Sequence, residues 1–136
     1  MSEKASPVLT AAQMAEVDRL MVEVYGIAVP QTMENAGRNL AEQARRMLGG
    51  RLARRKVTVL CGGGHNGGAG LAGARHLHNR GAEVTVILAA NPARLKKFTA
   101  QQWWIVQAMG LDTPEARRHH TPEAVMSEIA VTRDYP

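Results

Sequence analysis

The stretch Cys61-Gly62-Gly63-Gly64-His65-Asn66-Gly67-Gly68-Ala69-Gly70 decides the fold. Apolar, largely β-branched residues precede it over 57–60, and a helical pattern follows it over 71–77. This order predicts a strand, a glycine-rich turn and a helix, with glycines at the G-x-G-x-x-G spacing of a dinucleotide-binding turn. Glycines leave no Cβ in a ligand's path, and the free amides at a helix start favour an anion. The pattern predicts a phosphate-binding turn; the alternative is a turn that uses glycine only for close packing.

Two features separate this turn from other nucleotide sites. The second predicted strand ends in Leu88-Ala89-Ala90-Asn91, which offers no acidic residue for a ribose hydroxyl. The turn also lacks the Gly-Lys-Ser/Thr of a P-loop. The sequence therefore argues against both an ordinary Rossmann NAD site and a P-loop.

Two helices are predicted before the glycine stretch. Thr10 and Gln13 fit a capping box for a helix over 11–25, whose apolar residues we expect to fill the core. Thr32 is a candidate N-cap for a second helix that ends at Gly49-Gly50. In the first turn of that helix, Asn35 could brace a neighbouring loop and Gly37 could permit close packing, or the segment could be an ordinary polar helix start.

Near-continuous apolar strands alternate with helices from residue 57 onward. The patterns predict strands over 57–61 and 84–88, and helices over 69–80 and 93–109. Such strands imply a parallel sheet covered on both faces. Because a third strand is only begun at 131–136, we expect an incomplete sheet, whose open edge favours self-association into a homo-oligomer.

The length and the net charge of the chain limit its domain organisation and its classes of binding partner. The 136 residues suit one domain, and the formal net charge of +5 favours anionic partners. Basic residues cluster just before the first strand, but a solvated helix end explains them better than nucleic-acid binding, because no aromatic residue is interleaved with them. These residues are Arg45, Arg46, Arg51, Arg54, Arg55 and Lys56.

Cys61 is the only cysteine, and its place in an apolar strand predicts a core residue rather than a nucleophile. The N-terminus shows no apolar signal region, and no run of residues is long enough to span a membrane. From the sequence we therefore expect a cytoplasmic protein with no membrane partner.

The whole chain resembles the front part of the NAD(P)H-hydrate epimerase family, the YjeF N-terminal domain. The likeness begins at Leu9-Thr10-Ala11-Ala12-Gln13-Met14 and includes Tyr25-Gly26-Ile27 and Met33-Glu34-Asn35-Ala36-Gly37. It is strongest from Cys61 to Leu77. The glycine stretch and the Met-Glu-Asn-Ala-Gly segment, in this order and separation, carry the resemblance.

The resemblance implies a three-layer α/β/α Rossmann-like fold. It implies a single domain over residues 1–136, with N-terminal helices over 8–50 and a Rossmann-like core over 56–136 that is incomplete. Members of the family interconvert the R and S forms of hydrated NADH and NADPH, an isomerase reaction that repairs damaged cofactor. The implied ligand is therefore an NAD(P)H-hydrate or a related nucleotide.

The resemblance also implies the binding residues. The family loop reads Gly-x-Gly-Asn-Asn-Gly-Gly-Asp-Gly, and its Asn-Asn-Gly-Gly-Asp part contacts the nucleotide; the corresponding residues here are His65, Asn66, Gly67, Gly68 and Ala69. The second Asn of the family, Asn66 here, is also a potassium ligand. Two positions depart from the family, since His65 replaces an Asn and Ala69 replaces an Asp.

The catalytic residues are not identified from this sequence. In the family, a later strand with an Asp and a nearby Ser supplies the acid–base group, and we expect that region beyond Pro136. Two functions follow: an epimerase-like domain that binds a hydrated nicotinamide nucleotide, or a non-catalytic nucleotide-binding or protein-interaction module. The reading frame past Pro136 would discriminate them.

Overall fold

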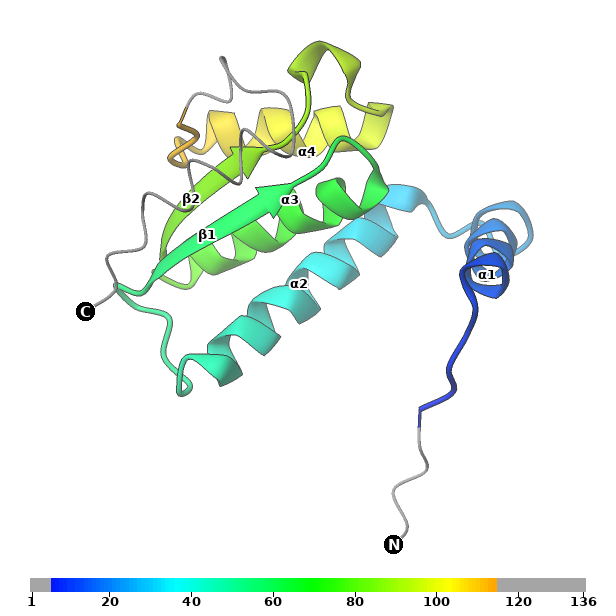
Figure 1. The fold of residues 1–136 in the computed structure, drawn as a ribbon, viewed down its shortest axis with the longest axis horizontal. Helices are drawn as coiled ribbons and strands as arrows, with labels where there is room; N and C mark the ends of the chain where they lie inside the picture. The colour runs from blue at the N-terminus through cyan, green and yellow to red at the C-terminus, as the bar shows by residue number, and fades with distance from the viewer. Residues whose placement is uncertain (1–5, 115–136) are drawn as a thin grey trace, which may run out of the picture.

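The computed structural model describes residues 6–114 as an α/β fold (Figure 1). The elements follow the order predicted from the sequence. They are α1 (Ala11–Glu23), α2 (Val29–Met47), β1 (Lys56–Cys61), α3 (His65–Asn79), β2 (Glu83–Leu88), the 3-10 turn η1 (Pro92–Arg94) and α4 (Lys97–Ala108). None of the helices in this part of the chain is long and apolar enough to cross a bilayer.

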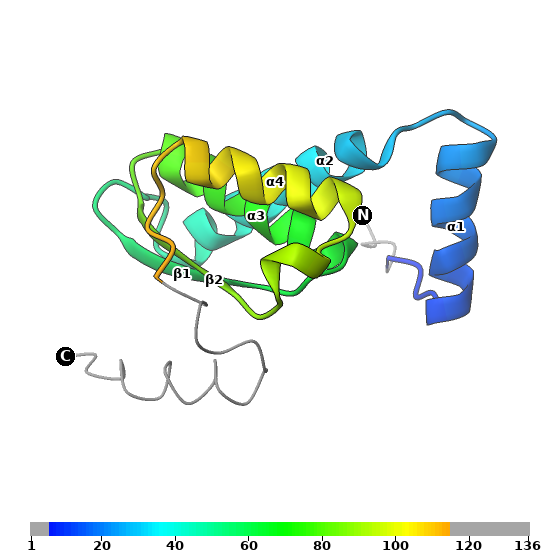
Figure 2. The ribbon, with the colours of Figure 1, turned by 90° about the horizontal axis from the view of Figure 1, so that it is seen from above.

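The sheet is parallel, as predicted. β1 pairs with β2 in a register that places Lys56 opposite Glu83 and Cys61 opposite Leu88. Helices α2, α3 and α4 lie together on one face of these strands (Figure 2). On the opposite face Leu60 keeps 48% of its surface exposed, so residues 6–114 supply two of the three layers expected.

β2 also has a neighbour on its second edge. The amide of Val86 donates to the carbonyl oxygen of Asp112 at 2.8 Å, and Thr85 and Asp112 form a parallel bridge. The Thr85 hydroxyl donates to the Asp112 carboxylate at 2.9 Å. The sequence did not predict this pairing, because two or three residues are too few to show strand alternation. The strand predicted at 131–136 lies outside the described residues.

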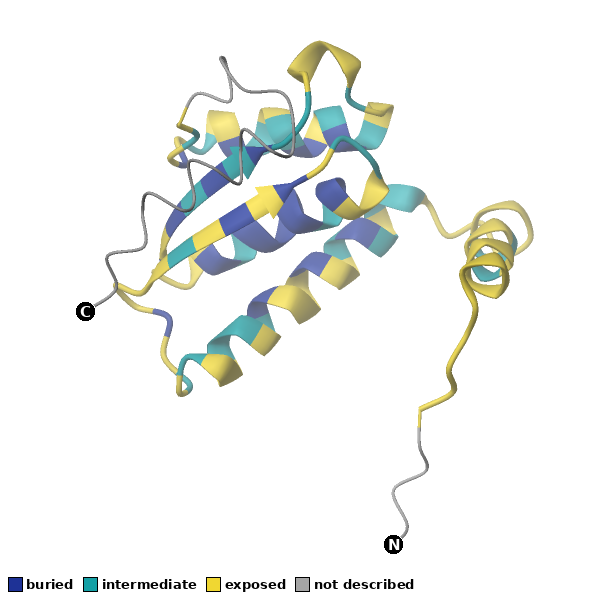
Figure 3. Cartoon of the chain, viewed as in Figure 1, coloured by how far each residue is buried: buried dark blue, intermediate teal, exposed yellow. Residues whose placement is uncertain are grey.

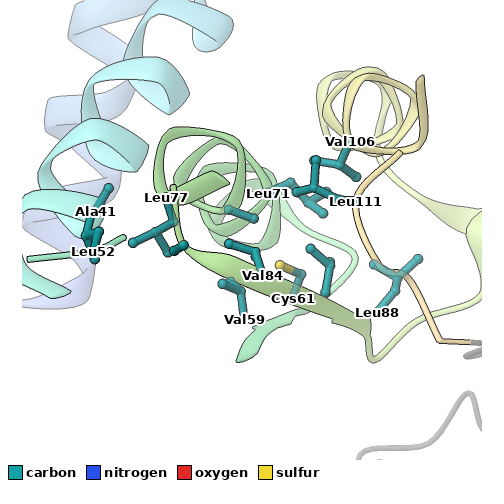
Figure 4. Close-up of a cluster of buried hydrophobic side chains, with 13 residues drawn as sticks. Ala41, Leu52, Val59, Cys61, Leu71, Leu77, Val84, Leu88, Val106 and Leu111 are labelled. Atoms are coloured by element: carbon teal, nitrogen blue, oxygen red, sulfur yellow. The ribbon is translucent and has the colours of Figure 1, made fainter. Parts of the chain in front are cut away.

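The core lies between the sheet and the helices. Val59 and Cys61 of β1 and Val84, Val86 and Leu88 of β2 are buried; these are every second residue of β2 and of the second half of β1, and Val57 on the same face is half-buried. Leu71 and Leu77 of α3 pack on this face, and the cluster extends to Ala41, Leu52, Val106 and Leu111 (Figure 4). Because successive side chains of a strand point to opposite faces, this alternation places the apolar side chains on the face that packs against α3.

Helices α2 and α3 pack closely and in parallel. A Cβ added to Gly37 of α2 would lie 2.6 Å from the backbone nitrogen of Gly73 in α3. One added to Gly73 would lie 2.8 Å from a methyl of Leu40. The prediction that Gly37 permits close packing is therefore confirmed.

The expectation that α1 fills the core is wrong. Its N-terminus has the predicted capping box, with the Gln13 amide donating to the Thr10 hydroxyl at 3.2 Å. None of its thirteen residues is buried, however, and it stands away from the other elements (Figures 1 and 3). Met14 keeps 44% of its surface exposed. Amphipathic spacing shows that a helix needs a partner surface but does not identify it.

Three predicted boundaries also change. α2 begins at Val29 rather than after Thr32, because Pro30 fits the first helical turn, where its missing N–H costs nothing. α3 begins at His65 rather than at residue 69, so it includes six of the ten residues of the glycine stretch. The helix predicted over 93–109 divides into η1 and α4; the Asn91 side chain accepts from the Ala93 amide and starts the short turn.

Candidate functional site

The glycine stretch forms the connection between β1 and the start of α3. Gly64 is the N-cap residue, with φ −91° and ψ −171°, and the first helical amide bonded to the backbone is that of Gly68, which donates to the Gly64 carbonyl at 3.1 Å. Within residues 6–114 the amides of His65, Asn66 and Gly67 donate no hydrogen bond to the backbone. Unbonded amides at a helix start are a ready site for an anion.

Two glycines of this stretch are required by packing. Gly67 is buried so close to Gly62 that a Cβ would overlap the Gly62 backbone. Gly68 is buried against α2 and α4: a Cβ there would lie 2.5 Å from the Met33 methyl and 3.0 Å from the Thr99 hydroxyl. The close-packing interpretation of the turn therefore applies to these two positions.

Two other glycines have space around them. A Cβ built on Gly62 or Gly64 meets no atom within 4 Å in the described structure, and neither glycine has a positive φ. Neither packing nor backbone conformation requires a glycine at these positions. Space beside unbonded amides is what a phosphate-bearing ligand needs, so Gly62 and Gly64 mark the side of the loop that a ligand could approach.

The start of α4 holds the loop in place. The Thr99 hydroxyl, which is fully buried, donates to the Gly64 carbonyl at 2.8 Å, and the Lys96 amide donates to the Gly63 carbonyl at 3.2 Å. Sequence reasoning missed Thr99. A threonine inside an otherwise core-facing helix was the available signal, since a buried hydroxyl requires a hydrogen-bond partner.

The side chains expected to bind ligand lie at the beginning of α3. His65 and Asn66 are exposed, Ala69 is half-buried, and Gly67 and Gly68 are buried. The first turn of α3 contains no acidic residue. The positive end of its dipole is therefore not compensated from within that turn, which favours a negatively charged group near His65 and Asn66.

Glu34 joins the two helices beside the loop. Its carboxylate accepts from the Arg75 guanidinium and lies 2.7 Å from Nε2 of His76. Arg75 and His76 are each 18% exposed, whereas Glu34 is 47% exposed. Among residues 6–114 Asn35 braces no loop: its Oδ1 accepts from Arg38 at 2.6 Å, within α2. Glu34 therefore fixes α2 on α3, and the sequence alone did not reveal these partners.

Cys61 is a core residue, as predicted. It is 1% exposed, and burial raises the pKa of its thiol to about 12. A thiol with so high a pKa is almost entirely protonated at neutral pH and is a poor nucleophile. The structure thus assigns Cys61 to packing between β1 and α3.

For the expected potassium ion, the described side chains identify one candidate ligand. Residues 6–114 contain no group of three or more His, Cys, Asp or Glu side chains that could hold a metal ion. Asn66 can offer one exposed amide oxygen. Potassium takes several oxygen ligands, backbone carbonyls included, so Asn66 would supply one ligand among several.

Comparison with known proteins identifies relatives over most of the chain. The family model described as YjeF-related protein N-terminus matches residues 30–133. A bifunctional NAD(P)H-hydrate repair enzyme Nnr of Moorella thermoacetica is 44% identical over 102 residues, which are 75% of this chain and 19% of that protein. An NAD(P)H-hydrate epimerase of Dehalogenimonas lykanthroporepellens is 41% identical over 102 residues, or 75% of this chain and 41% of that protein.

A solved structure supports the same relationship. The crystal structure of the yeast protein ynu0, YNL200c, superposes with a TM-score of 0.70 and 26% sequence identity. The match covers 79% of this chain and 46% of the yeast chain. The chain thus spans less than half the length of each of these relatives.

Proposed function

The chain belongs to the YjeF-related N-terminal family, and we propose that its glycine loop binds a hydrated nicotinamide nucleotide, as in an NAD(P)H-hydrate epimerase-like domain. The relatives named above are an NAD(P)H-hydrate repair enzyme and an NAD(P)H-hydrate epimerase. The proposed role is therefore repair of damaged NADH and NADPH, and the proposed location is the cytoplasm.

One observation carries the proposal. Unbonded amides at the start of α3 lie beside two glycines, Gly62 and Gly64, that neither packing nor φ requires. A pyrophosphate or phosphate accepts hydrogen bonds from such amides and is favoured by the helix dipole. In this account the exposed side chains of His65 and Asn66 contact the rest of the nucleotide, while Gly67, Gly68 and Ala69 form the wall of the site.

We also propose that the site binds a potassium ion through Asn66. The exposed amide oxygen of Asn66 would be one ligand of the ion, and other ligands would have to come from elsewhere. No step of the reaction is therefore assigned to potassium.

We expect low epimerase turnover from this chain. Epimerisation needs a positioned acid–base group, and loss of such a group typically lowers a rate by about 10² to 10⁴. Ala69 supplies no carboxylate, and Cys61 is buried with a raised pKa. His65 is the exposed titratable residue in the first turn of α3, and its imidazole can donate or accept a hydrogen bond. A non-catalytic nucleotide-binding or protein-interaction module is the alternative.

Interconversion of purified R- and S-hydrates tests the proposal. The unmodified chain should convert them slowly, and the double variant His65→Asn with Ala69→Asp should bind them more tightly with a smaller gain in turnover. Ala36→Asp, which adds a carboxylate at an exposed position of α2, is the matched control and should change neither. Rapid turnover by the unmodified chain would contradict this expectation and show that a residue within these 136 supplies the proton transfer.

A further inference from the structure

The connection between β2 and α4 lies directly against the glycine loop. The Ala89 amide donates to the Cys61 carbonyl at 2.8 Å, and the Lys96 amide donates to the Gly63 carbonyl at 3.2 Å. Between these two hydrogen bonds, a Cβ built on Gly63 would lie 3.1 Å from the methyl group of Ala90. The side chains of this connection are therefore neighbours of any ligand that binds the loop.

Two basic side chains of this connection are available to an anion. Arg94 is the last residue of η1, and Lys96 is the N-cap residue of α4. Both are exposed, and neither forms an ion pair with the other described residues. Lys97 differs, because its ammonium nitrogen lies over the Phe98 ring, 5.4 Å from the ring centre. Arg94 and Lys96 are thus the basic residues that could contact a ligand of the loop.

The segments around these two residues carry no acidic side chain. The sequence contains no Asp or Glu over 61–82, which includes the glycine loop and α3, and none over 89–111, which includes η1 and α4. Glu34, which lies beside α3, is already bound by Arg75 and His76. The starts of α3 and α4 add the positive ends of two helix dipoles at the same place. This end of the molecule therefore favours negative charge.

The start of α4 departs from the usual chemistry of a helix N-terminus. Helices prefer Ser, Thr, Asp or Asn at the N-cap and acidic residues in the first turn, because these complement the free amides and the dipole. α4 instead begins with Lys96 at the N-cap and Lys97 after it, with no side-chain cap and no acidic residue in its first turn. Two lysines at the positive end of a dipole destabilise the helix. Local departures of this kind are expected where a residue serves binding rather than stability.

The position of Arg94 and Lys96 after β2 indicates which part of a nucleotide they would contact. In open parallel sheets, ligands bind outside the carboxyl ends of the strands. In dinucleotide-binding folds, the segment after the second strand contacts the 2′ position of the adenosine ribose. An acidic residue there accepts from a 2′-hydroxyl, whereas a basic residue accommodates a 2′-phosphate. Here no acidic residue follows β2, and two basic residues do.

We propose that Lys96, assisted by Arg94, binds the 2′-phosphate of NADPH-hydrate, so that the site prefers this nucleotide to NADH-hydrate. The inference rests on the proposed function, because the glycine loop must first hold the nucleotide at the start of α3. A phosphate monoester carries a charge of about −1.5 to −2 at pH 7, whereas the corresponding group of NADH-hydrate is a neutral hydroxyl. A hydrogen bond between charged groups typically changes a dissociation constant about tenfold, so we expect a preference of at least that size.

Isothermal titration of the full chain with NADPH-hydrate and, separately, with NADH-hydrate tests the preference. Lys96→Gln removes the charge but keeps a polar side chain; it should weaken binding of NADPH-hydrate about tenfold and that of NADH-hydrate less than about twofold. Arg94→Gln should act in the same direction with a smaller effect. Arg51→Gln is the matched control, because Arg51 is equally exposed but precedes β1, at the opposite end of the strands, and should change neither affinity.

A second variant separates a binding role of Lys96 from a structural one. Lys96→Ser supplies α4 with a preferred N-cap residue, so it should raise the Tm by about 3–5 °C while it removes the preference for NADPH-hydrate. Equal binding of both nucleotides by the unmodified chain would overturn the inference and leave the glycine loop as the nucleotide site. An equal loss of both affinities in Lys96→Gln would also overturn it. Binding of neither nucleotide by the unmodified chain would contradict the proposed function and this inference with it.

Discussion

Gly37 and Gly73 face each other where α2 packs on α3, and a Cβ on Gly37 would lie 2.6 Å from the Gly73 backbone nitrogen. Backbone cannot retreat as a flexible side chain can, so Gly37→Ala must push the helices apart. We expect it to lower the free energy of unfolding by about 1–3 kcal/mol, measured by urea denaturation.

The sign of this effect is diagnostic. In an unobstructed helix, replacing Gly by Ala is stabilising by about 1 kcal/mol. Ala36→Gly, at the neighbouring exposed position of α2, serves as the control and should lower the stability by about 1 kcal/mol, which measures the intrinsic helix preference there. An increase in stability on Gly37→Ala would refute the close contact between α2 and α3.

Thr99 should support both the stability and the ligand affinity of the glycine loop. Thr99→Val keeps the shape of the side chain but removes the hydroxyl that donates to the Gly64 carbonyl. We expect a loss of about 0.5–1.5 kcal/mol in the free energy of unfolding, because the loop loses one hydrogen bond while the Gly64 carbonyl still accepts from the Gly68 amide. Calorimetric affinity for the hydrated nucleotide should fall as well. Thr99→Ser retains the donor and should preserve most of both; equal losses in the two variants would mean that the methyl group, not the hydrogen bond, matters.

The general fold could be predicted from the sequence because its signals are local. Alternating apolar residues fix β1 and β2, and left-handed glycines such as Gly81 end the helices where expected. The start of α3 was predicted four residues late because Gly67 and Gly68 are poor helix formers. Their burial against other segments outweighs that preference, and tertiary contacts of this kind leave no local pattern.

The candidate site could be predicted only in part for the same reason. His65 and Asn66 lie at the start of α3, where the glycine spacing predicts a ligand. Nothing in the sequence of the loop indicates Thr99, which contacts Gly64 from 35 positions further along the chain. Glu34 likewise contacts residues 41 and 42 positions further along the chain. Contacts between residues so far apart in the sequence can be identified only from the three-dimensional packing of the helices.

Cys61 should make the stability of the fold depend on alkaline pH. Its thiol pKa rises from an ordinary 9.0 to about 12 in the folded chain. The folded state therefore binds a proton that the unfolded state loses, so this contribution is complete below pH 9 and disappears as the pH rises toward 12. Between these values the free energy of unfolding should fall by up to about 1.4 kcal/mol per pH unit.

Comparison with Cys61→Ala isolates this effect from the titration of lysine and tyrosine. The variant should be less stable at pH 8 because it leaves a gap beside α3, but its stability should decline less steeply above pH 9. Denaturant titrations at pH 8 and pH 10.5 provide both values. Parallel pH profiles for the two proteins would contradict a buried, protonated thiol.

Binding of a hydrated nicotinamide nucleotide is the most direct test of the central claim. Isothermal titration of purified NADPH-hydrate into the 136-residue chain should show saturable binding. Gly64→Val should abolish that binding, because its side chain would project into the open space beside the unbonded amides. Its loss of stability should stay at about 1 kcal/mol, the cost of replacing glycine by a poor N-cap residue. Ala108→Val, at the exposed end of α4, should bind like the unmodified chain. No saturable binding by the unmodified chain, or undiminished binding by Gly64→Val, would contradict the assignment of the glycine loop as the nucleotide site.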